Sequence, residues 1–121
     1  MPEKAFFVLT HGRAHPERSS LPFVMALAAL ASHLDAVIGL QTDGVEVAVK
    51  GCADTMAAPG FPPLAELMSD YRKLGGKILI LDTCVKGRKI DADTQLVDNA
   101  EVVSAARFMG ELSSATRSLT Y

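Results

Sequence analysis

The sequence predicts an α/β fold, a single three-layer domain over residues 1–121 with a mainly parallel sheet and helices on both faces. Short, continuously apolar runs such as 5–10 and 77–81 are typical of strands that are covered on both sides. These runs alternate along the chain with stretches of helical periodicity, which favours parallel strands joined by right-handed crossovers. A chain of 121 residues, 49% of them hydrophobic, is also long and apolar enough to bury one core.

The first strand is expected at Ala5–Thr10 ("AFFVLT"). A polar loop follows, and Ser19 or Ser20 is expected to cap a helix over Leu21–Ala31 that has a proline in its first turn. This stretch carries no charge and is apolar on several faces. A helix of that kind must be covered on more than one side, so we expect a second copy of the chain to cover part of it.

The middle of the chain contains a second strand, a loop and the clearest helix. The strand is expected at Ala36–Gln41, while Val45–Gly51 fits either a strand or a short helix. Residues 52–63 hold three prolines and are expected to form a loop. A helix is predicted over Pro62–Leu74, with prolines at its start and two glycines after its end. Its apolar positions follow helical spacing and are Leu64, Leu67, Met68, Tyr71 and Leu74.

Three more elements complete the predicted fold. "KILIL" at 77–81 is expected to be a buried strand, and a brief strand is expected at 100–104. Ser104 is then expected to cap a helix that runs through Ala115, and 118–121 forms the last strand. The residues of that helix expected to face inward are Phe108, Met109 and Leu112.

Composition and missing motifs exclude several functions. A net charge of −2 provides no electrostatic footprint for nucleic acid or an anionic membrane, and no apolar run reaches the 18 or so residues of a membrane span. The start "MPEKAFFVLTHG" does not resemble a secretory leader. Two cysteines outside any C-x-x-C pair indicate free thiols in a reducing cytoplasm. No P-loop, G-x-G-x-x-G or G-x-S-x-G sequence is present, so a phosphate- or nucleotide-dependent enzyme has no supporting loop.

Polar residues follow two of the predicted strands. In open α/β sheets, ligands bind beyond the carboxyl ends of the strands. Residues 10–13 ("THGR") follow the first strand, and 82–84 ("DTC") follow the third. If both strands are central and parallel, these side chains lie on the same rim. The candidate binding residues there are His11, Arg13, Asp82, Thr83, Lys86 and Arg88.

Cys84 is the best candidate for a reactive group. A thiol is nucleophilic as its thiolate, which neighbouring cations stabilise, and Lys86, Arg88 and Lys89 lie close in sequence while Asp82 opposes them. The alternative is a small core residue, because free cysteines are among the most buried residue types. Both interpretations stay open from the residues alone.

The other cysteine and the histidines are weaker candidates. Cys52 lies in a loop whose only near cation in sequence is Lys50. His11 and His15 are four residues apart but precede a proline in a loop, and no third ligand is evident, so no metal site is predicted. His11 remains a candidate acid/base partner for a thiol, since it follows a strand on the expected rim.

The order and spacing of four segments resemble the DsrE/DsrF-like (YchN-like) family of small sulfur-relay-type proteins. The segments are "FVLTHG", "TDGVEVAVKG", "ILILDTCVKGRKI" and "LVDNAEVVSAARFMGELSSATRSLTY", which together extend over nearly the whole chain. The resemblance implies a three-layer domain of flavodoxin-like topology, assembly into trimers or hexamers, a cytoplasmic location and no organic cofactor. It also implies handling of sulfane sulfur as a cysteine persulfide, with other sulfur-relay proteins as possible partners.

The position of the cysteine departs from the family pattern. The sulfur-transferring subunits carry their cysteine at the position of Leu81, and Cys84 matches the second cysteine of a C-x-x-C-like pattern in other relatives. Two hypotheses follow. In the first, Cys84 carries a persulfide in a sulfur relay. In the second, the protein is a non-catalytic homo-oligomer that binds a small ligand, and Cys84 only lines the site.

Overall fold

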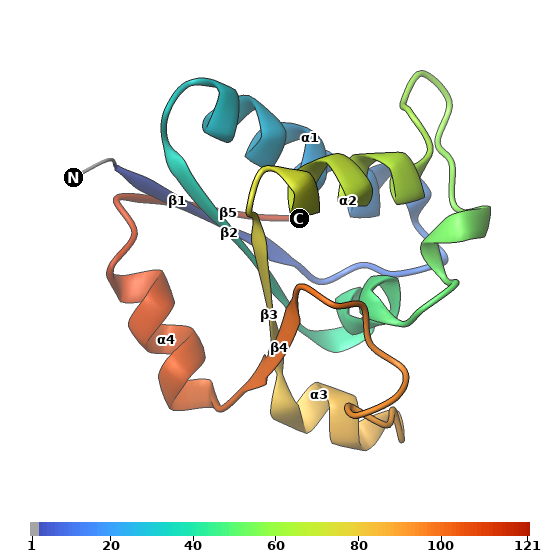
Figure 1. Cartoon of the computed structure of the whole chain (residues 1–121). Coiled ribbons are helices and arrows are strands. Elements are labelled where there is room, and N and C mark those ends of the chain that lie inside the picture. The colour runs from blue at the N-terminus through green and yellow to red at the C-terminus, as the bar shows by residue number, and fades with distance from the viewer. Residues whose placement is uncertain (1–2) are drawn as a thin grey trace.

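Five parallel strands form one sheet in the computed structural model, which describes residues 3–121 (Figure 1). The strands are β1 (Lys4–Leu9), β2 (Asp35–Leu40), β3 (Lys77–Leu81), β4 (Ala100–Val103) and β5 (Arg117–Thr120). The α-helices are α1 (Pro16–Ala31), α2 (Leu64–Lys73), α3 (Asp82–Gly87) and α4 (Ala105–Ser113), and the 3₁₀ helices are η1 (Thr42–Ala48) and η2 (Ala53–Thr55).

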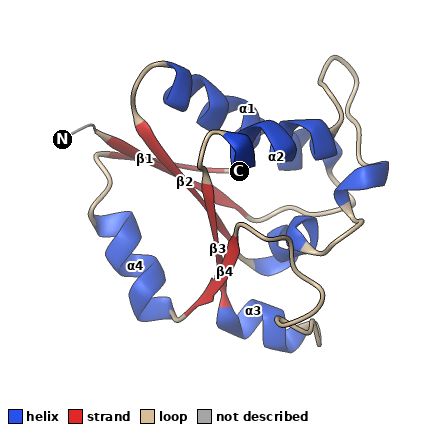
Figure 2. Cartoon of the chain, in the orientation of Figure 1, coloured by secondary structure: helices blue, strands red, loops and turns tan. Residues whose placement is uncertain are grey.

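The strand order β4-β3-β2-β1-β5 explains which helix covers which face. The chain moves from β1 to β4 in one direction, and α1 and α2 then lie on one face of the sheet (Figure 1). It returns to the far side of β1 to form β5, and α4 lies on the opposite face, as right-handed crossovers require after a reversal. Figure 2 shows the resulting layers, with the red strands between blue helices. The predicted three-layer α/β fold is confirmed, and every pairing between strands is parallel.

The larger part of the core lies between the sheet and the α1–α2 layer. The rings of Phe23 on α1 and Tyr71 on α2 meet edge to face, with centroids 5.7 Å apart. The Tyr71 hydroxyl donates to the backbone oxygen of Lys77 at 2.6 Å, which satisfies a buried polar group. Burial raises the pKa of Tyr71. This residue therefore ties α2 to the start of β3 and stays neutral in the folded protein.

A smaller core cluster lies under α4. Phe6 on β1 and Phe108 on α4 pack edge to face, with centroids 5.3 Å apart. Gly39 on β2 makes room for this pair, because a Cβ there would lie 2.6 Å from the Phe108 ring and 2.7 Å from the Phe6 ring. A side chain at this position would push α4 away from the sheet.

The start of α1 corrects one prediction. The helix begins at Pro16, five residues before the expected start, and neither Ser19 nor Ser20 caps it. Proline suits a first turn because its ring sets φ and the N–H it lacks has no helical partner there. Both serines are buried inside the helix. The Ser19 hydroxyl donates to the backbone oxygens of the preceding loop, at 2.9 Å from His11 and 2.8 Å from Gly12.

The remaining differences concern short elements and two side chains. The ambiguous stretch after β2 is a 3₁₀ helix, and the cysteine segment, for which no helix was predicted, forms α3. Ser104 caps α4 as predicted, and its hydroxyl accepts from the Arg107 backbone N–H at 3.2 Å. Two residues expected on apolar inner faces are exposed instead, Met109 (54%) and Leu74 (59%). Leu74 follows the last residue of α2, where the helical spacing no longer applies.

Within residues 3–121, none of the helices combines the length and the apolar character that crossing a bilayer demands.

Candidate functional site

Three neighbouring strands end at the edge where the candidate site lies. Thr10 follows β1, Thr42 follows β2 by two residues, and Cys84 lies in the first turn of α3 directly after β3. The backbone N–H of Thr42 donates to the Cys84 sulfur at 3.1 Å. The Thr42 hydroxyl oxygen lies 2.7 Å from the backbone oxygen of Thr10 and 2.7 Å from that of Gln41. Thr42 therefore links the ends of all three strands.

Cys84 is half-buried, so its sulfur belongs neither to the closed core nor to the open surface. It packs against the larger core cluster, on the α1–α2 side of the sheet. Leu81, the position that the family pattern assigns to the sulfur-carrying cysteine, packs against the smaller cluster under α4. The shift of three residues therefore places this cysteine against the other face of the sheet.

Arg88 is the cation that reaches the Cys84 segment. Its guanidinium donates to a carboxylate oxygen of Asp43 at 2.7 Å and to the backbone oxygen of Cys84 at 3.3 Å. The hydrogen bond to Asp43 raises the pKa of Arg88, and the Cys84 thiol adds to the effect. Because Asp43 follows Thr42, this ion pair joins η1 to α3 beside the thiol. Of the predicted residues on α3, Asp82 is half-buried, and Thr83 and Lys86 are exposed.

The loop after β1 contributes the other two predicted residues, His11 and Arg13. The His11 ring packs edge to face on His15, with centroids 4.9 Å apart, and its Nδ1 lies 3.2 Å from the Thr10 hydroxyl. The Arg13 backbone N–H donates to the Glu46 carboxylate at 2.9 Å. Thus His11 is joined to the site through Thr10, and Arg13 is held against η1.

Close packing fixes this loop. A Cβ on Gly12 would overlap the backbone oxygen of Asp43 and the carboxylate of Glu46. Only a residue without a side chain allows the loop after β1 to approach η1 this closely. The loop and η1 thereby form one wall of the edge, next to Thr42.

Cys52 has surroundings that its sequence neighbours do not predict. It is 5% exposed, and its sulfur lies 3.8 Å from the Met56 sulfur. A cation that interacts with it is Arg13, from a loop 39 residues earlier in the chain. Interaction with the Cys52 thiol is the main cause that raises the pKa of Arg13. The predicted site residue Arg13 therefore interacts with Cys52.

Two residues of the edge were missed by sequence reasoning, Thr42 and Asp43. Both lie in the turn-like "TDGVE" after the second strand. A signal was available, since the argument that places residues after β1 and β3 on one rim applies equally to residues after β2. Without the strand order, nothing indicated that β2 lies between the other two.

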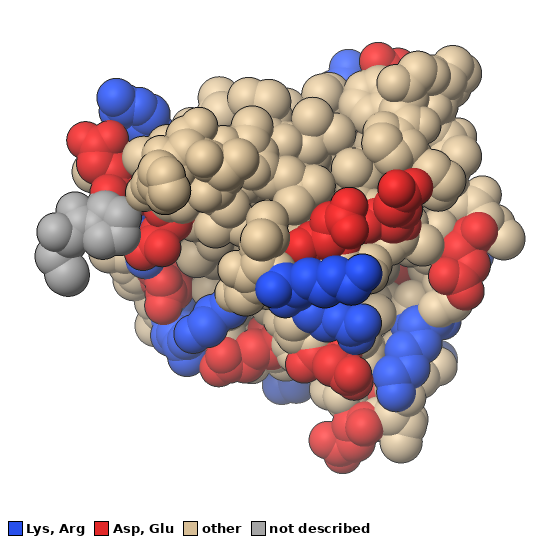
Figure 3. Space-filling model, turned by 45° about the horizontal axis from the view of Figure 1, so that its top comes forward, with Lys and Arg blue, Asp and Glu red and all other residues tan. Residues whose placement is uncertain are grey.

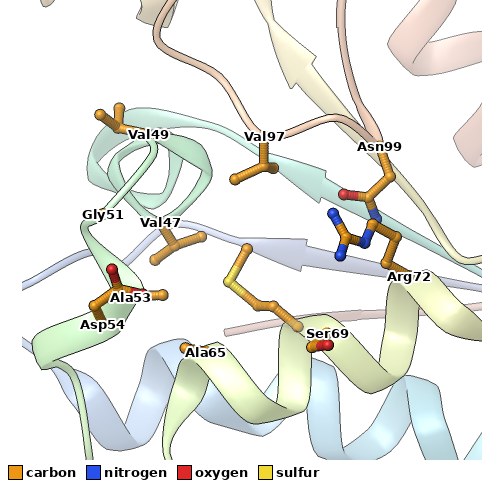
Figure 4. A pocket seen from close by; sticks show the side chains of 11 residues that line it. Val47, Val49, Gly51, Ala53, Asp54, Ala65, Ser69, Arg72, Val97 and Asn99 are labelled. Atoms are coloured by element: carbon orange, nitrogen blue, oxygen red, sulfur yellow. The ribbon is translucent and has the colours of Figure 1, made fainter.

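The described residues, 3–121, contain no group of three or more His, Cys, Asp or Glu side chains that could hold a metal ion. A separate pocket of about 150 Å³ lies between η1, η2, α2 and the segment before β4, and Cys84 is not among its lining residues. In Figure 4, Arg72 and Asn99 lie together at one end of this pocket, with Val47 and Val97 along its walls. It is therefore mainly apolar, with Arg72 and Asn99 at one end and Asp54 at the other.

Comparisons with known proteins agree with this fold. The sequence model of the DsrE/DsrF-like family matches residues 3–121. An uncharacterized protein of Methanocaldococcus jannaschii, MJ0760, is 32% identical over 111 residues, which are 92% of this chain and 40% of that protein. The chain thus spans about two fifths of the length of this curated relative.

Two solved structures are similar over the full length of both chains. The YchN protein from E. coli superposes with a TM-score of 0.71 at 18% identity. MTH1491 from Methanobacterium thermoautotrophicum, a protein of unknown function, superposes with a TM-score of 0.65 at 13% identity. At these identities the similarity establishes the fold.

Proposed function

The chain belongs to the DsrE/DsrF-like family, and on that premise we propose that it handles sulfane sulfur, with Cys84 as the thiol that accepts the sulfur atom and passes it on. The observation that carries this proposal is the hydrogen bond from the Thr42 N–H to a half-buried sulfur at the carboxyl edge of the sheet. A relay needs a sulfur that a partner can reach and that the protein holds in one orientation. Both properties distinguish Cys84 from Cys52.

The proposed transfer is an exchange between sulfur atoms. The Cys84 thiolate attacks the outer sulfur of a donor persulfide, a new S–S bond forms, and the donor leaves as a thiolate with the electrons of the broken bond. An acceptor thiolate then attacks the outer sulfur of the Cys84 persulfide, and Cys84 leaves as a thiolate. No external oxidant or reductant is consumed. A donor to the Cys84 sulfur assists both steps, because the sulfur is anionic as nucleophile and as leaving group.

The predicted binding residues near Cys84 have different roles in this proposal. Arg88, fixed by Asp43, supplies positive charge next to the Cys84 backbone. Lys86, Thr83 and Asp82 border the approach of a donor or acceptor.

The proposed setting is the reducing cytoplasm, because both cysteines are free.

Sulfur loading tests the proposal directly. The protein is incubated with inorganic polysulfide, and its intact mass is measured before and after treatment with cyanide, which removes sulfane sulfur as thiocyanate. We expect wild type and Cys52→Ser to gain a sulfur atom that cyanide removes, and Cys84→Ser to gain none. The cyanide step matters because a sulfinic acid adds two oxygens of nearly the same mass. Equal uptake by Cys84→Ser and wild type contradicts the proposal.

We also propose that copies of the chain associate through α1 and β5. Figure 3 shows an upper surface that is largely free of charge, where α1 lies. A groove of about 260 Å³ runs between α1 and β5, and its rim includes Met25 and Leu119, which are 40% and 48% exposed. The resemblance implies a trimer or hexamer. Sedimentation of wild type and Leu119→Lys tests the surface: the variant should dissociate, and a monomeric wild type contradicts the assembly.

A second candidate function is the binding of a small ligand without chemistry. The pocket in Figure 4 favours it, since its apolar walls, with Arg72 and Asn99 at one end and Asp54 at the other, suit a small apolar molecule that carries polar groups. Native mass spectrometry of the purified protein distinguishes the two functions. A retained ligand that survives Cys84→Ser and is lost in Ala65→Phe supports this candidate. Absence of any ligand in the wild type, together with sulfur loading at Cys84, supports the relay.

A further inference from the structure

The backbone of Thr42 has a conformation that its side chain disfavours. Its φ is 51°, in the left-handed region. Threonine is branched at Cβ, and such residues rarely adopt this region because Cβ crowds the backbone. Strained backbone of this kind persists only where the surrounding structure enforces it, and it is concentrated at functional sites.

Two contacts of Thr42 explain what the strained backbone accomplishes. The hydroxyl oxygen lies 2.7 Å from the backbone oxygens of Thr10 and Gln41, so its single proton is shared between the end of β1 and the residue before Thr42. The backbone N–H meanwhile donates to the Cys84 sulfur at 3.1 Å. The φ angle of Thr42 sets how this N–H lies relative to its own side chain and to η1, so the anchored hydroxyl and the N–H are held in one arrangement. The side chain thus holds the backbone in the conformation that directs its donor at the sulfur.

We propose that Thr42 is a positioning residue, whose hydroxyl anchors the end of β2 to the end of β1 so that its backbone N–H stabilises the anionic sulfur of Cys84. This inference rests on the proposed function, because the N–H is proposed to stabilise Cys84 in the two steps of sulfur transfer in which its sulfur is anionic, first as nucleophile and then as leaving group. Thr42 does not react itself, and its contribution passes through the hydrogen bond. It also explains how a cysteine three residues beyond the family position acquires a donor, since that donor comes from the neighbouring strand.

Substitutions at position 42 separate the hydroxyl from the shape of the side chain. Thr42→Val keeps the branching and loses the hydroxyl, whereas Thr42→Ser keeps the hydroxyl. Position 42 is exposed, so neither change disturbs the core. The charged and titratable groups on the segments near Cys84 are the same in all variants; they are Asp82 and Lys86 on α3, Arg88 directly after it, Asp43 and Glu46 on η1, and His11 after β1. A difference between variants therefore originates at position 42.

The measurement is the rate of Cys84 alkylation by iodoacetamide between pH 6 and pH 10, followed by peptide-resolved mass spectrometry. We expect Thr42→Val to react about tenfold more slowly than wild type at pH 7, because a lost hydrogen bond to a charged group is worth about one factor of ten or more. The pH at which the rate is half-maximal should rise by about one unit. Thr42→Ser should stay within about twofold of wild type.

Two outcomes overturn the inference. One is a Thr42→Val profile that matches wild type, and the other is a Thr42→Ser profile as slow as that of Thr42→Val. Urea midpoints of all variants identify any loss of folding. Unfolding would not slow the alkylation of Cys84, and it would make Cys52 reactive as well, so it cannot be mistaken for the expected result. The assay needs no sulfur donor. If wild type fails to load polysulfide sulfur, the proposed function fails, while the alkylation series still decides whether Thr42 positions its N–H at Cys84.

Discussion

The two cysteines of this chain show how different the surroundings of a thiol can be within one small sheet protein. Cys84 lies half-buried at the carboxyl edge and accepts a hydrogen bond from a neighbouring strand end. Cys52 is 5% exposed and contacts the Met56 sulfur. Each has an arginine nearby, so positive charge does not separate them. The two cysteines differ instead in their access to solvent and in the backbone N–H that donates to Cys84, and these two properties define the candidate site.

The largest expected difference is in reactivity. In native protein at pH 8, iodoacetamide should alkylate Cys84 at least about 100-fold faster than Cys52, because a buried thiol reacts only after local opening and each factor of ten corresponds to about 1.4 kcal/mol of opening free energy. Peptide-resolved mass spectrometry over a time course measures both rates. In concentrated urea the two rates should converge. Equal rates in the native protein would remove the distinction between the two sites.

Replacing the cysteines should affect the stability of the protein in the opposite order, with the larger loss at Cys52. Cys52→Ser should lower the free energy of unfolding by about 1–3 kcal/mol, because it buries a hydroxyl in an apolar environment. Cys84→Ser should change it by about 0.5 kcal/mol or less, as expected at a partly exposed site. Urea denaturation followed by circular dichroism provides both values. A larger loss for Cys84→Ser would mean that Cys84 is chiefly a packing residue.

A smaller effect tests whether the charge near Cys84 adds to its reactivity beyond what its exposure to solvent provides. Asp43→Asn removes the carboxylate that neutralises Arg88, while the hydrogen bond to the Cys84 backbone oxygen still keeps Arg88 close. The net positive charge near the thiol then rises, so the Cys84 alkylation rate should increase about two- to threefold at low salt, an effect that 0.5 M salt should remove. The matched change at the other cysteine is Arg13→Gln, which should leave Cys52 as slow as before. Acceleration of Cys52 in Arg13→Gln would show that the arginine, rather than burial, keeps that thiol unreactive.

Acidification provides the smallest effect and a control that lies on the other face of the sheet. The hydrogen bond from Lys4 lowers the pKa of Glu111 on α4. A carboxylate whose pKa is lowered on folding adds stability above its ordinary pKa of about 4.3, and this stability is lost as the pH falls through the lowered value. Free energies of unfolding of wild type and Glu111→Gln should therefore converge between pH 6 and pH 3. Convergence should not depend on either cysteine, so the Cys52→Ser and Cys84→Ser proteins should behave alike.

Much of the fold could be predicted because its pattern is local. The buried strand β3 occupies the predicted residues 77–81, and α2 lies within its predicted range. The start of α1 could not be predicted in this way, since its first turn is polar and only Pro16 marks it. Met109 was misplaced because α4 covers its face of the sheet without a neighbouring helix, so part of its apolar surface remains exposed.

The candidate site could be predicted in part. Cys84 and Arg88 were placed on the correct edge because parallel strands end together. Thr42 and Asp43 were not identified, and neither was the proximity of Arg13 to Cys52. These errors share a cause: each contact joins residues about 30 to 45 positions apart, and no local pattern records which loops meet.

The sequence by itself determined the α/β alternation, the parallel sheet and the position of a cysteine just beyond a central strand, because hydrophobic periodicity and strand direction are properties of neighbouring residues. The tertiary structure alone decided which backbone donor faces that cysteine, which arginine accompanies each thiol and which face of the sheet carries the sulfur. Those choices depend on strand order and on the paths of the loops after β1 and β2, where close approach at Gly12 and the strained backbone of Thr42 bring distant residues into contact.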